Sequence, residues 1–331
     1  ASRWGLQGIL MVALTAGVWH YWYKDENFHH ELVMQHCIEE TDWEGVISES
    51  EKQVDEPTRA IVVMRNLALT RLGRMLNERY NFPYGGKKSN TPLPFDIMYH
   101  VFGRMLYYQY GLLNDCHRMC MEEGVEYGWR VEIQKYLARC SMLMGEKQAA
   151  QNALNRLRHT QFHGQWADMM QQLLNDPKQI AENRETGPVS HMLQYANALG
   201  SDGGNVENYI MNQLARQGSD DPYFLDQAML ATLWTRDPVL FYARFANYIR
   251  LHRHDPMPRV FQEAAYLFGK LGKRPDLDKM PFDKNVKKTY EKFMKEAEKY
   301  NNQSADIGRT ALYPFYGNTY YYEYYFLRNT K

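Results

Sequence analysis

Two thiols and a histidine lie close together in the sequence and could supply half of a metal site. Cys116, His117 and Cys120 would place both thiols on one face of a helix, because helical positions i and i+4 are neighbours. A structural zinc site needs a second pair of Cys or His residues at a similar spacing, and the sequence has none. We therefore expect both thiols to pack in the core, with no metal ion and no cofactor. In an oxidising compartment, a disulfide to Cys37 or Cys140 stays open as an alternative.

Two histidine clusters resemble fragments of metal sites. His29, His30 and Glu31 match the start of a zincin helix, but Met34 stands where the second histidine is required. The cluster from His252 to Asp255 follows a predicted helix, where positive side chains interact favourably with the helix dipole. We expect the first cluster to hold no metal and the second to end a helix.

Adjacent acidic residues are the remaining candidates for chemistry, as a general acid and base. The pairs Glu39-Glu40, Glu122-Glu123 and Asp220-Asp221 are neighbours in sequence, so the two side chains of a pair point in different directions on a helix. An acid/base couple would therefore need residues that meet only in the tertiary structure. The sequence has no nucleophile elbow, Walker loop or dinucleotide fingerprint. We expect no enzymatic activity.

The charge balance argues against a nucleic-acid partner. Lys plus Arg and Asp plus Glu each total 39 in 331 residues, so no net field would attract phosphates. Even the lysine-rich stretch from Lys270 to Lys299 contains interleaved acids, which is typical of a solvated helix face. The unusual feature is the aromatic content, with 25 Tyr, 14 Phe and 7 Trp residues. Rings of this kind suit broad, amphipathic contact surfaces.

The aromatic residues are densest at the end of the chain, where seven Tyr and two Phe lie between Tyr313 and Phe326. Such a tail could bind a peptide or a sugar, could pack back on the last helices as a cap, or could insert among lipid headgroups. The candidate partner-binding residues in this tail are Tyr313, Phe315, Tyr316, Tyr320, Tyr322 and Tyr324.

The elements that must position these residues are helices. From Phe28 onward, apolar residues recur at spacings of three and four, and Gly, Pro, Asn and Asp mark the turns. Asp42, Asp221 and Asp237 each stand where an aspartate can cap a helix N-terminus. Predicted helices cover residues 58–77, 95–110, 112–123, 127–144, 147–159, 164–175, 177–185, 257–270 and 282–300, and further helices start at Asp221 and Asp237. A turn-rich loop at 81–94 and a break at 200–205 interrupt the array.

The segment from Trp4 to Tyr23 predicts a membrane-spanning helix. Its twenty residues carry no formal charge and would reach roughly 30 Å as a helix, which is one hydrocarbon thickness. Trp4 at one end and the rings from Trp19 to Tyr23 at the other are typical of interfacial positions. Arg3 against the mixed charges of residues 24–26 favours a cytoplasmic N-terminus, which would place the rest on the outer, periplasmic side of a bacterial inner membrane. A cleavable signal peptide and a buried core helix are the alternatives.

Three glycines mark an internal repeat. Gly73, Gly111 and Gly145 each follow a run of long apolar or aromatic residues, at spacings of 38 and 34 residues. Gly145 is followed by Ala150 and Gly111 by Cys116, at the same distance. In this pattern the chain resembles the tetratricopeptide-repeat family over residues 28–160 and, more loosely, over 221–300. The resemblance implies antiparallel helix pairs that stack as a solenoid.

Together these features predict an all-α chain in four parts: a transmembrane anchor (1–24), an N-terminal tetratricopeptide-like array (25–160), a C-terminal helical array (161–310) and a tyrosine-rich tail (311–331). The whole also resembles membrane-anchored bacterial proteins that carry such repeats, which implies a location but no activity. We expect a membrane-anchored scaffold whose partners are another protein or peptide and, through residues 4–23, the lipid bilayer. The alternative is a glycan-binding or glycan-processing protein with an aromatic-lined groove between paired helices.

Overall fold

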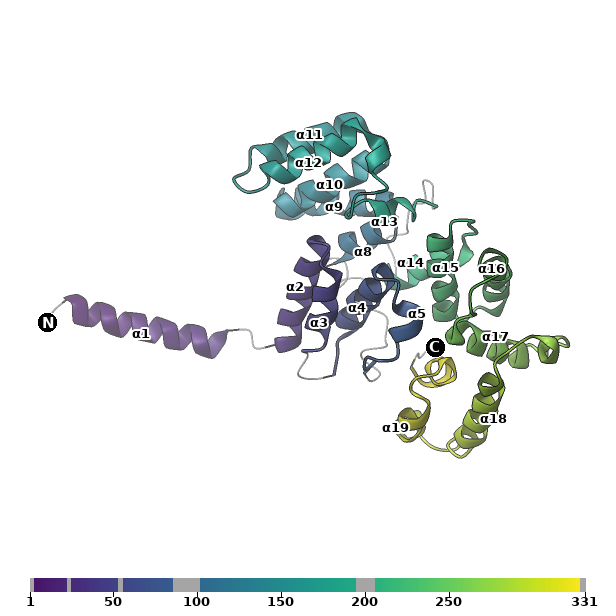
Figure 1. Ribbon diagram of the computed structural model, residues 1–331. Helices are drawn as coiled ribbons and strands as arrows, with labels where there is room; N and C mark the ends of the chain where they lie inside the picture. Colours follow the sequence, from purple (N-terminus) through teal and green to yellow (C-terminus); the bar gives the residue numbers. More distant parts are fainter. Residues whose placement is uncertain (1–2, 23–24, 53–55, 86–101, 195–205, 328–331) are drawn as a thin grey trace.

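The computed structural model describes residues 3–22, 25–52, 56–85, 102–194 and 206–327, and every regular element in these ranges is a helix (Figure 1). The predicted all-α, repeat-like fold is confirmed. Most helices pack chiefly against the helices next to them in sequence, as in an array where each helix pair stacks on the following one. The predicted loop at 81–94 lies only partly within the described residues, as does the predicted helix at 95–110, and the predicted break at 200–205 lies outside them.

The helices fall into successive groups along the body of the molecule (Figure 1). The first group contains α2 (Glu26–Glu39), α3 (Trp43–Ser50), α4 (Arg59–Arg71) and the short α5 (Met75–Glu78). The second contains α8 (Gly103–Gln109), α9 (Leu113–Tyr127), α10 (Val131–Leu143), α11 (Lys147–Arg158), α12 (Gly164–Asn175) and the short α13 (Gly187–Ser190). The third contains α14 (Val206–Arg216), α15 (Pro222–Thr235), α16 (Pro238–Leu251) and α17 (Arg259–Leu271). The last contains α18 (Lys284–Glu298), α19 (Ala305–Tyr316) and α20 (Tyr320–Tyr322), which continues into a π-helical turn, Glu323–Leu327.

The predicted caps and turn glycines are confirmed. Asp42, Asp221 and Asp237 each accept hydrogen bonds from backbone N–H groups in the first turn of α3, α15 and α16. Gly111 and Gly145 have φ angles of +76° and +80°, in the left-handed region that L side chains rarely adopt. At Gly111 a Cβ atom would also lie 2.4 Å from the carbonyl oxygen of Met192, so the glycine permits the turn after α8 to approach the segment after α13 closely.

Helix α9 is longer than predicted. It runs to Tyr127 instead of ending near residue 123, and α10 begins at Val131. Gly124 inside α9 leaves room for the ring of Trp129. A Cβ atom at this position would lie 2.4 Å from carbon atoms of that ring. Gly128, with a φ angle of +93°, then ends the helix. The structure also differs from the prediction at residues 177–185. In place of the predicted helix, only a short 3₁₀ turn, Pro177–Gln179, forms there.

The prediction of an N-terminal transmembrane helix was wrong. The segment does form a helix, α1 (Arg3–Tyr21), which projects from the body and has no buried residue (Figure 1). However, among the described residues no helix combines the length and the apolar character that crossing a membrane requires. An uncharged residue is not always apolar. The mean hydropathy of α1 is lowered by Gln7, His20, the glycines and the weakly hydropathic Trp and Tyr rings, which stand among its Leu, Ile and Val residues.

Helix α15 joins the two large hydrophobic cores. Phe224 and Ala228 pack in the core that begins at α2, whereas Leu225 and Met229 pack in the core that continues to the end of the chain. Apolar residues on more than one side of α15 allow it to be buried against both cores. Tyr320, Tyr321 and Tyr322 of the aromatic tail are part of the second core.

Candidate functional site

The six tail residues proposed to bind a partner do not share one environment. Tyr320 and Tyr322 are fully buried, and Tyr316 and Tyr324 are half-buried against the second core. Tyr313 and Phe315 lie on α19 and are 44% and 75% exposed. Only these two residues therefore offer a large ring surface to another molecule.

The buried part of the tail, Tyr320 to Tyr322, forms hydrogen bonds to three other helices, α15, α18 and α19. Three consecutive phenols each donate a hydrogen bond to a backbone carbonyl of a different helix: Tyr320 to Leu233, Tyr321 to Val286 and Tyr322 to Arg309, at 2.9–3.0 Å. Successive residues on a helical turn point about 100° apart, so one turn can reach three neighbours. These three tyrosines therefore pack in the interior with each hydroxyl group hydrogen-bonded.

Glu323 connects this tail to the first helix group. Its Oε2 atom accepts hydrogen bonds from the Arg79 guanidinium at 2.6 Å and from the Tyr80 hydroxyl at 3.1 Å. Arg79 and Glu323 are both almost fully buried. The pair joins positions 244 residues apart in sequence.

The thiols and histidines are used structurally. Cys116, Cys120 and Cys140 are buried free thiols, as predicted for the first two, and burial raises the pKa of Cys116 well above its usual value. His30 contacts Glu49 at 2.7 Å between α2 and α3. Within the described ranges, no group of three or more His, Cys, Asp or Glu side chains could hold a metal ion.

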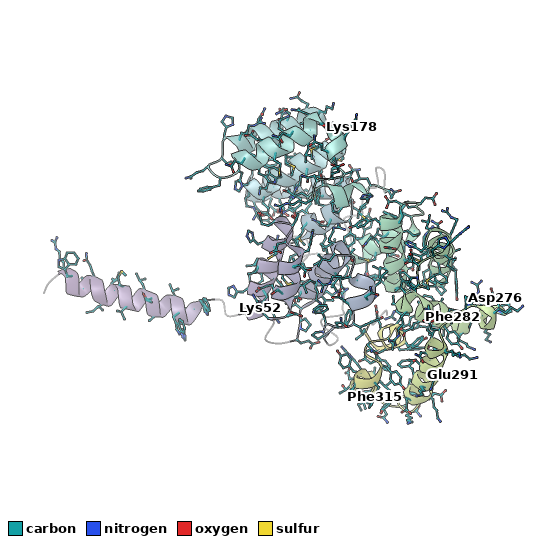
Figure 2. The ribbon with its side chains drawn as sticks, viewed as in Figure 1. Lys52, Lys178, Asp276, Phe282, Glu291 and Phe315 are labelled. Carbon is teal, nitrogen blue, oxygen red and sulfur yellow. The ribbon has the colours of Figure 1, made fainter. Side chains whose placement is uncertain are left out.

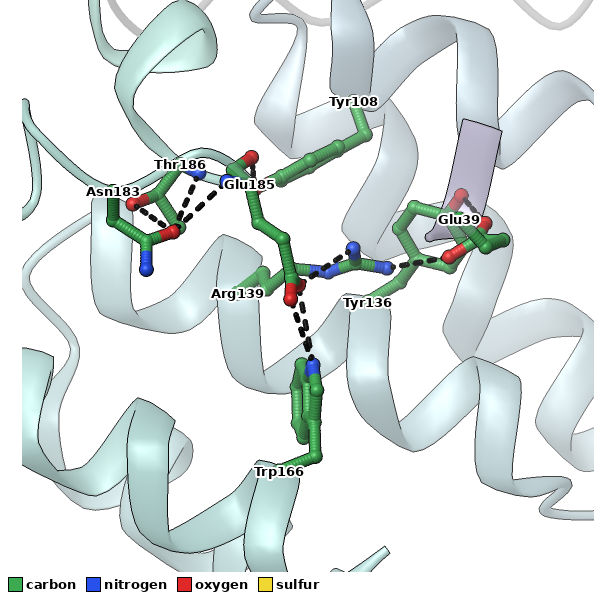
Figure 3. Close-up of polar contacts among 8 residues, drawn as sticks. All are labelled: Glu39, Tyr108, Tyr136, Arg139, Trp166, Asn183, Glu185 and Thr186. Atoms are coloured by element: carbon green, nitrogen blue, oxygen red, sulfur yellow. Dashed lines mark hydrogen bonds and ion pairs between the residues drawn. The ribbon is translucent and has the colours of Figure 1, made fainter. Parts of the chain in front are cut away.

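One carboxylate of each acidic pair binds an arginine: Glu39, Glu123 and Asp220. Figure 3 shows one such network, in which Arg139 lies between Glu39 and Glu185 at 3.1 and 3.4 Å. The same guanidinium stacks on the Tyr136 ring, 4.3 Å from its centre. Trp166 donates its indole N–H to Glu185 at 3.1 Å. The network ties α2, α10 and α12 to the segment that precedes α13 and leaves no acid/base couple there.

Two other acids follow the same rule. Glu123 binds Arg104 at 2.7 Å in the interior, and Asp220 binds Arg250 at the surface. The sequence could identify these carboxylates but not their arginine partners, which come from other helices.

An acidic residue that sequence reasoning missed, Asp226 on α15, lies beside the C-terminus of α16. His252 ends this helix, as predicted, and its ring stacks on Tyr248 at 4.3 Å. Its Nδ1 atom lies 3.1 Å from Asp255, and its Nε2 atom lies 3.9 Å from Asp226 on α15. Burial raises the pKa of Asp226 to about 6, although His252 partly opposes the shift.

Asp226 should make stability depend on pH. Because its folded-state pKa is above the ordinary value, the folded protein binds this proton more tightly, and the associated stability is lost as pH rises from about 4 to 6. We expect Asp226→Asn to be more stable than the parent above pH 6 by about 1 kcal/mol, a reduced figure because a third of the side chain is exposed. Urea unfolding of both proteins at pH 4.5 and 7.5 measures the difference. A gain of equal size at both pH values would contradict this assignment.

An open groove beside α18 combines apolar and charged lining residues. It has a volume of about 370 Å³ and lies between the end of α17 and the start of α18. Its apolar lining residues are Tyr266, Leu277, Met280 and Phe282, and its charged lining residues are Asp283, Lys284, Lys287, Lys288 and Glu291. Figure 2 shows Phe282 just before α18 and Glu291 on it, whereas Phe315 lies on the separate helix α19. We call this feature the α17–α18 groove.

Hydrogen bonds hold the groove in shape. The Gln262 amide donates to the Asp283 carboxylate at 2.9 Å, and the Asp283 backbone N–H donates back to the Gln262 side-chain oxygen at 2.9 Å. The rings of Tyr266 and Phe282 meet edge to face at 5.5 Å. The apolar wall is thus preorganised, and exposed lysines lie at its edge.

A family profile described as "Family of unknown function (DUF6057)" matches residues 3–328 of the chain. Neither the curated proteins nor the solved structures contain a match.

Proposed function

We propose that this chain, which belongs to the Family of unknown function (DUF6057), is a helical-repeat scaffold that binds an acidic segment of another protein. The observation that carries the proposal is the α17–α18 groove, which combines an apolar wall with three lysines. Stacked helix pairs with left-handed glycines between them support a tetratricopeptide-like scaffold, a class that binds extended partners.

The lysines around the groove favour an acidic partner. Helix α18 carries five lysines and three glutamates, and Lys284, Lys287 and Lys288 line the groove. Complementary charge speeds encounter and excludes partners of like charge, whereas a buried apolar anchor supplies most of the affinity. An acidic segment with one aromatic or aliphatic anchor matches both features.

Fluorescence anisotropy with three labelled peptides tests the proposal. The probes are a phenylalanine flanked by glutamates, the same peptide with alanine in place of phenylalanine, and a phenylalanine flanked by lysines. We expect only the first to bind. The double variant Lys287→Glu/Lys288→Glu should weaken its binding at least about tenfold, because attraction becomes repulsion at two positions.

Lys178→Glu is the matched control, since this exposed lysine lies on the short turn after α12, far from α18 in Figure 2. It should leave binding unchanged. Equal binding of the lysine-flanked peptide, equal loss in both lysine variants, or no binding up to roughly 1 mM would each reject the proposal.

A further inference from the structure

We propose that a cavity between α4, α14 and α15 binds a small uncharged molecule that carries amide or hydroxyl groups. The cavity is distinct from the α17–α18 groove and shares no lining residue with it. Its walls, charges, polar groups and size each restrict the molecule that fits.

Each of the three helices presents one face to the cavity. On α4 the lining residues are Arg59, Val63, Asn66 and Thr70; on α14 they are Glu207, Met211 and Leu214; on α15 they are Gln227, Leu230, Ala231 and Trp234. These spacings of three and four place each set on one side of its helix. Met75, Arg79, Tyr84, Tyr110, Glu323 and Leu327 complete the lining. The cavity therefore lies where the first group, the third group and the tail meet.

The charges in the wall cancel in pairs. The guanidinium of Arg59 binds both carboxylate oxygens of Glu207, and Arg79 binds Glu323 at 2.6 Å. All four side chains are almost completely buried. A charged ligand would lose its hydration and find no unpaired opposite charge in these pairs, so the site favours an uncharged one.

Four other polar side chains in the wall have no hydrogen-bond partner among the residues that the structure describes. The side chains of Thr70, Tyr110 and Gln227 are each more than nine-tenths buried and line the cavity, yet none hydrogen-bonds to another described residue. The Oδ1 atom of Asn66 is buried in the same wall, also without a partner in the described ranges. Buried polar groups are normally hydrogen-bonded, and together these four offer a hydroxyl, a phenol and two amides to a ligand.

The volume limits the size of the ligand. The cavity measures about 60 Å³. Roughly 10–15 Å³ is needed for each water-sized group, so about four to six non-hydrogen atoms fit. Apolar residues on the remaining wall, including Val63, Leu214 and Ala231, suit one methyl or methylene group. Acetamide has this size and chemistry, and acetate is its charged counterpart.

Methionine methyl NMR on the full chain tests the site, because Met75 and Met211 line the cavity and report directly on its occupant. We expect acetamide to shift these two methyl signals in a saturable titration, and acetate at equal concentration and pH to leave them unshifted. Thr70→Val keeps the side-chain volume but removes the hydroxyl, and it should weaken acetamide binding about two- to twelvefold.

Ala231→Leu fills the cavity and should abolish the shifts, whereas Thr310→Val, on the exposed side of α19, should change nothing. Shifts that persist unaltered in Thr70→Val, or equal shifts with acetate, would overturn the proposal. So would the absence of any saturable shift at Met75 and Met211 in the parent protein. Because Thr70→Val is isosteric, the test does not depend on whether Ala231→Leu folds.

Discussion

Replacing Arg139 by methionine will lower the free energy of unfolding by about 3–5 kcal/mol. The side chain is 4% exposed and pairs with two carboxylates, Glu39 and Glu185. Methionine keeps much of the volume but leaves both acids beside a neutral chain in the interior. The cost arises mainly from these uncompensated charges and only partly from the lost attraction. Urea unfolding followed by helical circular dichroism measures it.

Arg158→Met is the matched control for this prediction. Arg158 pairs with Asp168 at 2.7 Å, but the arginine is a third exposed and the aspartate is nearly two-thirds exposed. Exposed pairs contribute little, so we expect a loss below about 1 kcal/mol. Adding Glu39→Gln and Glu185→Gln to Arg139→Met should recover part of its loss, because the buried charges are then removed. Equal losses in Arg139→Met and Arg158→Met would show that burial does not govern this network.

Truncating Tyr321 to alanine will lower the free energy of unfolding by about 3–5 kcal/mol, as expected for a large ring in a packed core. The residue is fully buried, packs against Tyr290 at 5.3 Å and donates its hydroxyl to the Val286 carbonyl at 3.0 Å. Tyr321→Phe removes only the hydroxyl and should cost about 1 kcal/mol.

Phe315→Ala provides the contrast within the same tail. Its ring is 75% exposed on α19, so its removal should change stability by less than about 0.5 kcal/mol. Chemical denaturation of the three variants ranks them. If Phe315→Ala destabilised the protein as much as Tyr321→Ala, the division of the tail into buried and exposed rings would be incorrect.

Local features of the helices were predictable. Asp42, Asp221 and Asp237 cap helices because a cap needs only an oxygen and an N–H group three residues away. Gly111 and Gly145 adopt left-handed φ angles because glycine, which lacks a Cβ atom, reaches this region without steric cost. The burial of Cys116 and Cys120 followed from their spacing on one helix face.

Errors arose where a local pattern had more than one physical meaning. Residues 4–23 carry no formal charge, yet Gln7, His20 and the aromatic rings lower their hydropathy. The tyrosine-rich tail has three possible environments, because a ring with a hydroxyl suits a binding surface, a wet interface and a core equally well. Its burial depends on which carbonyls the neighbouring helices present.

The sequence by itself determined that the chain is helical, where several helices begin and turn, and that net charge is balanced. Periodicity, caps and glycines act over a few residues, so they can be read along the chain. Only the tertiary structure decided that Arg139 joins Glu39 to Glu185, that Glu323 binds Arg79, and that three helix faces enclose a polar cavity. These contacts join residues tens to hundreds of positions apart, and their energies depend on burial, which no local spacing specifies.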